Sequence, residues 1–476
     1  MRGLGLSISN ARTLALLAGL LVTLLNVVFI VTEQYWGLLL PFILGIVALG
    51  VFALDKVLLF LVVATPLSVF YMDERLHLGM SLPTEPLLVG LLILLLARIF
   101  YYAGFDRRVA SHPLAIALLA YLFWVFVTSI TSTMPWVSFK FFLARTWFIG
   151  VFFFLFSQLF REKKNLYRVQ WLYLVPLAAV VLYALVRLGQ YGLENKASEW
   201  VMSPFFKEHT SYAAVLALYV PVAVCFTFMP RQNLNRRLSA GLISLVLLAG
   251  LVFSYSRAAW LGLMVASLAG LLIYYRVLGM SLLVGVLVGG GFFWHYQEDI
   301  LIALQENTAT SDGGIEEHVE SVSNITTDDS NLERINRWKS AWRMFEDRPW
   351  FGHGPGTYMF RYAPYQKTYD MTLISTNAGD RGNAHSEFLG PLSEMGWPGP
   401  LFVAAIVLLT LLTGIRTYHQ MPAGRLKWLT LALLIGLISY WTHGTLNNFL
   451  SLDKAALPVW SFSAALVVLD RYHRKL

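Results

Sequence analysis

A set of cationic and titratable side chains lies close to the ends of long apolar segments, where a charge is costly unless it has a function. Arginine pairs bidentately with phosphate oxygens and stays charged at any relevant pH, and histidine accepts a proton near neutral pH. Together these residue types suit the departure of a diphosphate, with fixed cations on the leaving group and a histidine as general base for an attacking hydroxyl. The set comprises Lys140, Arg145, His209, Arg257, Arg334, His385 and Asp453.

Each of these residues also has a simpler interpretation. Arg257 lies between two apolar segments, where a snorkelling arginine or a tight interhelical turn would explain it. Lys140 and Arg145 are equally compatible with anchoring a helix at the membrane interface. Arg334 taken alone is an ordinary solvated helix charge, and His385 suits the cap of the next helix. Their predicted convergence on one side of a membrane favours the functional interpretation, and the paired carboxylates expected of a glycosidase are not evident there.

The elements that must position these residues are transmembrane helices. Of the 476 residues 57% are hydrophobic and only 13% charged, and the mean hydropathy is +0.60, whereas soluble chains carry roughly 25% charged residues. Apolar runs long enough for a ~30 Å hydrocarbon core recur along the chain. The sequence therefore predicts an all-α polytopic integral membrane protein with about 12–14 transmembrane helices. The runs lie at about 13–31, 36–54, 57–72, 86–102, 113–132, 142–160, 168–188, 210–229, 239–255, 258–275, 279–295, 397–415, 426–443 and 456–470.

The distribution of charge predicts the topology. Alternate connections carry the lysines and arginines, which gather on the cytoplasmic side of membranes, so both termini are expected in the cytoplasm and a long loop on the other side. This pattern accounts for the net charge of +8 and requires no nucleic-acid partner. The single cysteine, Cys225, lies in an apolar run, which excludes disulfides and cysteine-ligated metals.

The long loop divides the chain into three expected parts. Residues 1–295 form N-terminal transmembrane helices, residues 296–390 form the loop, and residues 391–476 form C-terminal transmembrane helices. The start of the loop, residues 306–331, is polar and acidic and is expected to be a mobile segment.

From residue 332 the loop is predicted to be helical, up to residues 347–349, where proline ends the helix. Ile335, Trp338, Trp342 and Phe345 recur at helical spacing and predict an apolar face. The remaining surface of the helix would carry Arg334, Arg337, Lys339 and Arg343.

Three motifs resemble those of the O-antigen ligase/polymerase family. Residues 254–262 resemble its arginine segment, and residues 333–358, with their Gly-His-Gly-Pro-Gly turn, resemble its loop signature. Residues 384–396 resemble its histidine motif, with Ser386 in place of the asparagine common there. The motifs follow the family order over about 150 residues; the rest of the chain matches in hydropathy and number of spans.

The resemblance implies a GT-C-like, metal-independent, inverting glycosyltransferase of the bacterial inner membrane with its active site at the periplasmic face. It implies an undecaprenyl-diphosphate-linked glycan donor and no cofactor. Arg257 and Arg334 would bind the donor diphosphate and His385 would activate the acceptor hydroxyl, while residues 332–346 would form a lid. The residues expected to bind substrate are Lys140, Arg145, His209, Arg337, Trp338 and Asp453.

Several functions stay open within and beyond this family. A ligase that attaches the glycan to lipid A-core is the first choice, a polymerase that extends the glycan repeat is the second, and a protein O-oligosaccharyltransferase is the third. A polysaccharide flippase is the alternative from another class, but it would require charges along a path exposed in turn to both membrane faces. A sensor or scaffold would fit if the arginines only anchor helices.

Overall fold

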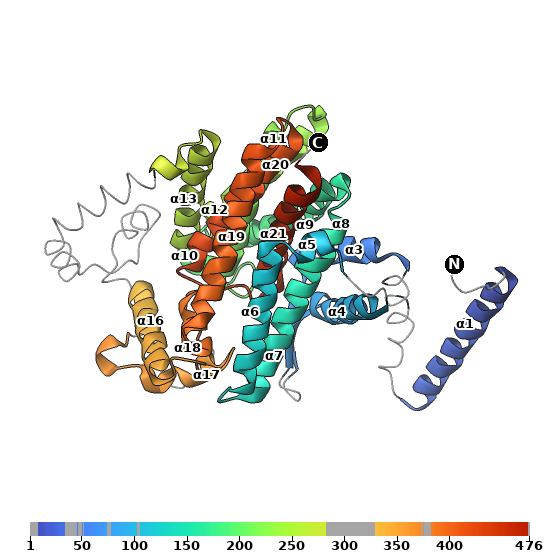
Figure 1. Ribbon diagram of the computed structural model, residues 1–476, viewed down its shortest axis with the longest axis horizontal. Coiled ribbons are helices and arrows are strands. Elements are labelled where there is room, and N and C mark those ends of the chain that lie inside the picture. The colour runs from blue at the N-terminus through green and yellow to red at the C-terminus, as the bar shows by residue number, and fades with distance from the viewer. Residues whose placement is uncertain are drawn as a thin grey trace. The chain divides into compact units, whose positions relative to one another are not determined.

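The computed structural model describes two compact units, Met1–Leu61 and Val62–Leu476. The first unit contains helix α1 (Ile8–Val31) and the start of α3 (Leu54–Leu67), and the second contains the remaining described elements (Figure 1). The described residues are 8–33, 45, 50, 52–73, 78–101, 105–281, 329–372, 375 and 382–474. Most of the runs predicted near 36–54 and 279–295, and most of the predicted mobile segment 306–331, lie outside them.

The second unit is helical apart from one short hairpin. Its elements are β1 (Val69–Asp73), β2 (Leu78–Leu82), α4 (Thr84–Tyr101), α5 (Arg107–Ala110), α6 (Pro113–Ile130), α7 (Pro135–Trp147), the π-helical η2 (Phe148–Leu155), α8 (Phe156–Leu159), α9 (Lys163–Gln190), α10 (Asn195–Ser198), α11 (His209–Phe228), α12 (Leu234–Val252), α13 (Arg257–Tyr274), α16 (Asp329–Asp347), α17 (Tyr358–Arg361), η3 (Ala363–Tyr365), η4 (Thr368–Asp370), α18 (Leu389–Met395), α19 (Pro398–Gln420), α20 (Arg425–Gly444), α21 (Asp453–Val468) and η5 (Leu469–His473).

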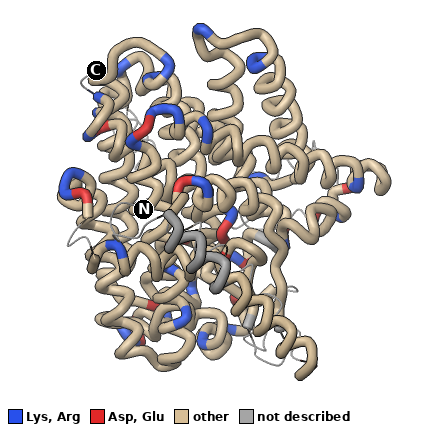
Figure 2. The backbone as a smooth tube through the Cα atoms, turned by 90° about the vertical axis from the view of Figure 1, so that its right-hand side faces the viewer, with Lys and Arg blue, Asp and Glu red and all other residues tan. Residues whose placement is uncertain are grey.

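The predicted helical membrane fold is confirmed. Among the described residues, eight helices are long and apolar enough to cross a membrane. They are α4, α6, the continuous run Pro135–Leu159, α9, α11, α12, α13 and α19. Helices α20 and α21 coincide with the last two predicted runs. Lysine, arginine and acidic residues gather mainly at the turns, as expected for helices surrounded by lipid (Figure 2).

The run predicted at 57–72 is wrong in its last five residues, 68–72. Helix α3 ends at Leu67, and strand β1 pairs antiparallel with β2, with Val69 opposite Leu82 and Asp73 opposite Leu78. Pro66 in the last turn removes a helical hydrogen bond, and the β-branched and aromatic residues after it favour an extended chain.

Glycines allow α20 to pack closely against two neighbouring helices. A Cβ at Gly262 of α13 would lie 2.8 Å from the carbonyl oxygen of Ser439, and one at Gly436 would lie 2.4 Å from that of Leu218 in α11. Without a hydrophobic force between helices in lipid, such close approach supplies the van der Waals contact that holds them together. It also fixes the start of α13 beside the end of α20.

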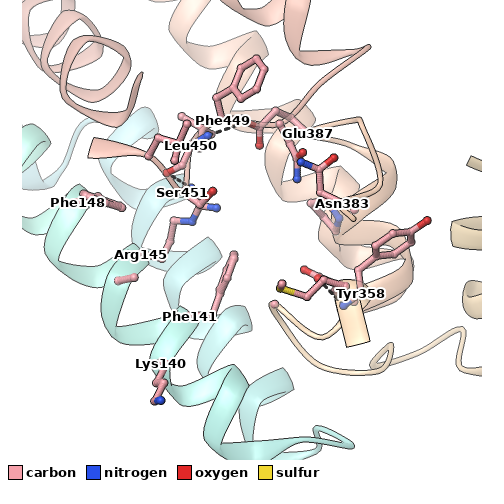
Figure 3. A pocket seen from close by; sticks show the side chains of 18 of the residues that line it. Lys140, Phe141, Arg145, Phe148, Tyr358, Asn383, Glu387, Phe449, Leu450 and Ser451 are labelled. Atoms are coloured by element: carbon pink, nitrogen blue, oxygen red, sulfur yellow. Dashed lines mark hydrogen bonds between the residues drawn. The ribbon is translucent and has the colours of Figure 1, made fainter. Parts of the chain in front are cut away.

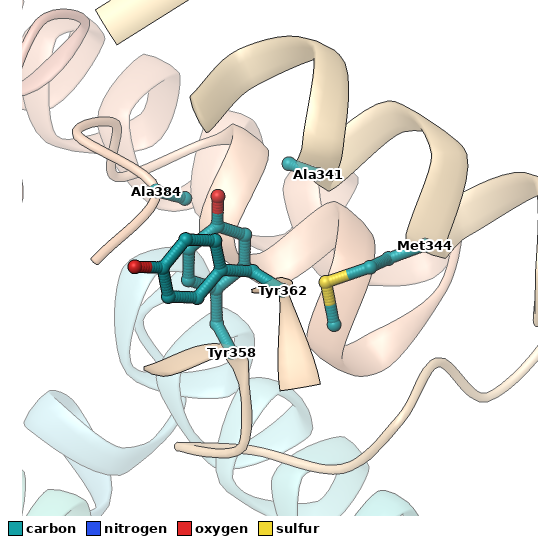
Figure 4. Packing of buried hydrophobic residues seen from close by; sticks show 5 residues of the cluster. All are labelled: Ala341, Met344, Tyr358, Tyr362 and Ala384. Carbon is teal, nitrogen blue, oxygen red and sulfur yellow. The ribbon is translucent and has the colours of Figure 1, made fainter. Parts of the chain in front are cut away.

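Helix α16 packs chiefly on α18, and also on η3 and η4, close to one end of the long helices (Figure 1). Its Ala341 and Met344 contact a cluster with Ala384 and two stacked tyrosines, Tyr358 and Tyr362, whose ring centroids are 5.2 Å apart (Figure 4). The helix ends at Asp347, as the following proline predicted.

The predicted apolar face of α16 is wrong in its orientation. Trp342 is 51% exposed, whereas the predicted surface residue Arg337 is 5% exposed. The buried face carries polar residues that find partners: Glu333 accepts a hydrogen bond from Nε of Arg337 at 2.5 Å, and Nδ2 of Asn336 donates to Gln366 at 2.7 Å. The hydrogen bonds of Glu333, Asn336 and Arg337 therefore allow the polar face of α16 to be buried.

Replacing Gly262 with leucine is expected to force α13 away from α20, because the new side chain would overlap the backbone at Ser439. Overpacking of this kind destabilises a protein by about 1–3 kcal/mol. The measurement is the midpoint of thermal unfolding in detergent, and Gly90→Leu is the control, since a Cβ at Gly90 meets nothing within 4 Å. Equal midpoints for the two variants would contradict the packing described.

Candidate active site

His385 is held in a constrained backbone conformation between α16 and the end of α20. Its φ of +46° is in the left-handed region, which is unfavourable for a residue other than glycine and is often found at functional sites. The indole nitrogen of Trp338 donates to its carbonyl oxygen at 3.3 Å, and Nδ1 of its ring lies 3.4 Å from Oδ1 of Asn447. With Nδ1–H directed at that oxygen, Nε2 carries the lone pair.

The surroundings keep this imidazole uncharged. Burial lowers the pKa of His385 to about 4, and the positive charges of Arg334 and Arg337 act in the same direction, against the hydrogen bond with Asn447. Because the pKa lies well below 7, the ring is neutral at physiological pH and able to accept a proton.

Arg334 is the cation that joins several parts of the site. It lies one turn before Trp338 on α16, and its Nη1 donates to Oδ1 of Asn331 at 2.9 Å. Its charge acts on His385 and also on the imidazoles of His209 and His443. The structure thus brings together Arg334 of α16, His209 of α11, His443 of α20 and His385 of the segment before α18.

Arg257 is the first residue of α13. The turn before it is fixed by Tyr255, whose φ is +51°, and by Nε1 of Trp260, which donates to the carbonyl oxygen of Leu251 at 2.8 Å. Because Gly262 packs against α20 at Ser439, the start of α13 lies at the same end of the bundle as the end of α20. Arg257 is therefore positioned at the end where Asn447 meets His385.

Arg337 is more constrained than a surface residue. Its guanidinium lies 4.1 Å from the centroid of the Tyr362 ring and forms an ion pair with Glu333. A Cβ on Gly382 would overlap this guanidinium, so Arg337 packs directly on the backbone that leads to His385. The predicted substrate residues Arg337 and Trp338 thus both contact the histidine segment, one by packing and one by a hydrogen bond.

Two buried glutamates, which the sequence had left without a role, organise the chain around His385. The carboxylate of Glu387 accepts hydrogen bonds from the backbone N–H groups of Phe449 and Leu450 at 2.8 and 2.9 Å and from the hydroxyl of Tyr440 at 2.8 Å. Burial raises its pKa, against the lowering effect of Arg145 and these donors. Glu387 thereby ties the histidine motif to the connection after α20, which contains Asn447.

Glu394 likewise accepts hydrogen bonds from the backbone of the glycine-rich turn, residues 352–356, and of the residues that follow it. Its carboxylate accepts from the N–H of Tyr358 at 3.0 Å, and its carbonyl oxygen accepts from the N–H of Gly354 at 2.8 Å. Burial raises the pKa of Glu394 to about 7. Gly354 has a φ of +112° and a Cβ there would overlap Ser132, which explains why this turn needs glycine.

Ser386, which replaces the expected asparagine, also has a local function. Its hydroxyl accepts from the N–H groups of Phe388 and Leu389 at 3.2 and 3.3 Å. It therefore satisfies backbone donors at the start of α18, as a serine does at a helix cap.

Lys140 and Arg145 line a cavity of about 910 Å³. Figure 3 shows both residues along α7, across the cavity from Tyr358 and Asn383. Arg145 is buried, donates from Nη1 to the carbonyl oxygen of Leu450 at 3.0 Å and packs on Phe141. Residues that flank His385, namely Asn383, Ala384 and Glu387, also line this cavity.

Asp453 and His209 occupy the first positions of α21 and α11. Asp453 is 2% exposed, and its Oδ2 accepts a hydrogen bond from the hydroxyl of Ser68 at 2.7 Å and another from Thr84. Its neighbour Lys454 donates to the carbonyl oxygen of Ser68 at 2.8 Å. These bonds tie α21 to the hairpin and α4 and leave Asp453 out of the cavity lining.

Fold and site together define a polytopic helical membrane protein in which arginine- and histidine-bearing segments meet at one end of the helices. Residues 242–404 match the family model described as O-antigen ligase. The matched region, about a third of the chain, contains Arg257, Arg334 and His385. Members of this family transfer glycans from lipid-linked substrates in membranes. A search of curated proteins finds no match.

Replacing Glu387 with leucine is expected to destabilise the protein strongly, because it leaves two backbone N–H groups and one hydroxyl buried without their acceptor. Each such loss costs about 1–3 kcal/mol. Glu387→Gln keeps an oxygen that accepts hydrogen bonds, so this variant should lose less stability. Glu162→Leu is the control and should lose little stability, because Glu162 belongs to an exposed ion pair. Thermal unfolding in detergent measures all three; similar midpoints for the two leucine variants would be inconsistent with this role.

Proposed function

We propose that this protein transfers a glycan from an undecaprenyl-diphosphate carrier to an acceptor hydroxyl, with inversion and without a metal ion. The observation that carries the proposal is the environment of His385: a neutral, oriented imidazole with arginines beside it. A general base next to fixed cations is what direct displacement of a diphosphate requires.

In the proposed reaction the donor diphosphate binds Arg257 and Arg334, and the acceptor hydroxyl approaches Nε2 of His385. The acceptor oxygen forms a bond with the anomeric carbon while the bond from that carbon to the phosphate oxygen breaks, and its electron pair leaves on the diphosphate. The acceptor proton passes to Nε2. The two guanidinium groups stabilise the negative charge that develops on the leaving group.

The same electrostatics supports an order of binding. Without donor, burial and, after it, the charges of Arg334 and Arg337 keep the pKa of His385 low, which makes it a weak base. A bound diphosphate offsets these cations, raises the pKa of His385 and makes it a better proton acceptor. The histidine would therefore become effective only when the glycan to be transferred is present.

The orientation proposed is a site at the periplasmic face with both termini in the cytoplasm. The alternation of lysine and arginine along the sequence supports it. Exposed tryptophans at the end of the helices where His385 lies also support a membrane interface there. Trp136 lies in the first turn of α7, and Trp350 and Trp397, whose ring centroids are 6.1 Å apart, precede α19. Within the family, we propose a ligase acting on lipid A-core, with glycan polymerisation as the second candidate.

A transfer assay tests the proposal. Purified protein in lipid is incubated with undecaprenyl-diphosphate glycan, lipid A-core and EDTA, and the product glycolipid is measured. Wild type is expected to form product, and His385→Ala, Arg257→Ala and Arg334→Ala to lose at least about a hundredfold in rate. Lys339→Ala is the control, since Lys339 lies on α16 but pairs with Asp370. Glycan lengthening on the carrier would identify a polymerase, and lipid crossing the bilayer without transfer would favour the flippase.

The pH dependence tests the role of His385 separately. A base acts only when unprotonated, so activity falls as the pH falls through its pKa. We expect kcat/KM for the donor, which reports the donor-free enzyme, to persist down to about pH 4, and the acidic limb of kcat to lie at higher pH. Coincident limbs near the ordinary histidine pKa of about 6.5 would contradict the environment described.

A further inference from the structure

A second charged centre lies at the end of the helices opposite His385. Helix α19 follows directly after α18 and the histidine motif, and α21 follows the connection that contains Asn447, so both helices begin close to His385. Because an α-helix rises 1.5 Å per residue, the 23 residues of α19 extend over about 35 Å. The end of α19 and the π-helical η5, which continues α21, therefore lie on the far side of the membrane-spanning region.

Three arginines surround one buried carboxylate at this end. The carboxylate is that of Asp470 in η5, and its Oδ1 accepts a hydrogen bond from Nη1 of Arg474 at 2.7 Å. Nη2 of Arg416 lies 3.7 Å from Oδ1, and Nε of Arg471 lies 3.9 Å from Oδ2. Burial lowers the pKa of His112, whose ring also lies 3.9 Å from Oδ2, to about 4, so this ring is uncharged at pH 7. The centre therefore carries three positive charges against one negative charge.

Two of these arginines have N–H groups that are available to a ligand. The side chains of Arg416 and Arg471 are 56% and 36% exposed. Their distances from Asp470 exceed the roughly 2.7–3.2 Å of an N–H···O hydrogen bond, and within the described part of the chain neither guanidinium forms one. Because both lie within 4 Å of the same carboxylate, they are held close together. Guanidinium groups pair bidentately with phosphate oxygens, so this pair suits a phosphate.

An exposed apolar stripe on α19 leads to this pair. Leu408, Leu412 and Arg416 follow one another at intervals of four residues, so they lie along one face of the helix. Both leucines are exposed, and α19 is long and apolar enough to cross a membrane, so the stripe faces lipid. A cation at the end of such a stripe suits an amphiphile with an acyl chain and an anionic head group. A soluble anion would leave the stripe uncovered.

We propose that Arg416 and Arg471 bind the phosphate of an anionic phospholipid whose acyl chain lies along Leu412 and Leu408. Basic clusters at the ends of transmembrane helices recognise such head groups by their charge. Asp470 holds the two arginines in place, and Arg474 keeps the carboxylate paired. The inference is independent of the proposed function, because it concerns the opposite end of the helices and no step of glycan transfer uses these residues.

Native mass spectrometry of the delipidated full chain, titrated with phosphatidylglycerol or with phosphatidylcholine, measures the binding of each lipid. Wild type is expected to bind phosphatidylglycerol roughly tenfold more tightly than phosphatidylcholine, and the double variant Arg416→Gln/Arg471→Gln is expected to lose this preference. The matched control is Lys163→Gln/Lys164→Gln, which removes the same charge from exposed residues at the same end of the helices, where α9 begins after α8. It should keep the preference of wild type.

Thermal unfolding checks that the arginine variant is folded. Its midpoint without lipid is expected to stay close to that of wild type, because Asp470 keeps its hydrogen bond with Arg474. If the midpoint falls, the single variant Arg416→Gln, which also keeps Arg471, carries the same test. Added phosphatidylglycerol is expected to raise the midpoints of wild type and of the lysine control more than that of the arginine variant, since a ligand that binds the folded state stabilises it.

Three results would overturn the inference. Equal losses in the arginine and lysine variants would show a diffuse positive charge of the kind that sets topology, with no site at Asp470. Equal binding of the two lipids by wild type would show that the head-group charge is not recognised. Displacement of phosphatidylglycerol by poly-glutamate at equal charge would assign the arginines to an acidic protein segment. Because the readout is lipid binding, a protein that transfers no glycan but shows the expected preference would contradict the proposed function alone.

Discussion

The site depends on one buried carboxylate, that of Glu387. In a segment enclosed by helices, backbone N–H groups need acceptors, and this carboxylate supplies one to Phe449 and Leu450 at once. It thereby joins two parts of the chain about 60 residues apart, the histidine segment and the connection after α20. Asn447, which contacts the ring of His385, and Asn448, which lines the cavity, both lie in this connection, so the same hydrogen bonds hold both in place.

The structure separates two cationic regions that a linear sequence presents as one set. Arg334 and Arg337 act on His385 from α16, whereas Lys140 and Arg145 line the cavity from α7. Asn383, Ala384 and Glu387, which flank His385, line the cavity as well, so the histidine segment contacts both regions.

Helix α16 shows how a segment outside the lipid is held differently from the transmembrane helices. Within the bundle, glycines at Gly262 and Gly436 permit backbone contact, and the packing is mainly of van der Waals kind. In α16 the buried face is instead polar, with Arg337 paired to Glu333 and packed on Tyr362. Burial of this polar face fixes the rotation of α16 about its axis, and with it the positions of Arg334 and Trp338 relative to His385.

The sequence by itself determined the class of fold and the residues of the three motifs. Hydrophobic runs must be helical in lipid, because only helices satisfy their own backbone there, so α19, α20 and α21 were predictable from hydropathy alone. Motif spacing likewise selected Arg257, Arg334 and His385, all within the matched residues 242–404. The roles assigned to them remain proposals.

Only the tertiary structure decided the partners of these residues. Hydropathy does not report side-chain pairing, so it could not reveal that Asp453 bonds to Ser68, that Trp342 is exposed while Arg337 is buried, or that Glu387 has three donors. The cavity is lined by residues of the hairpin, α4, α6, α7, η2, α17, α18–α21 and connections between them, which are distant in sequence. Such contacts depend on how helices pack, and packing is set by many weak contacts together and by no local pattern.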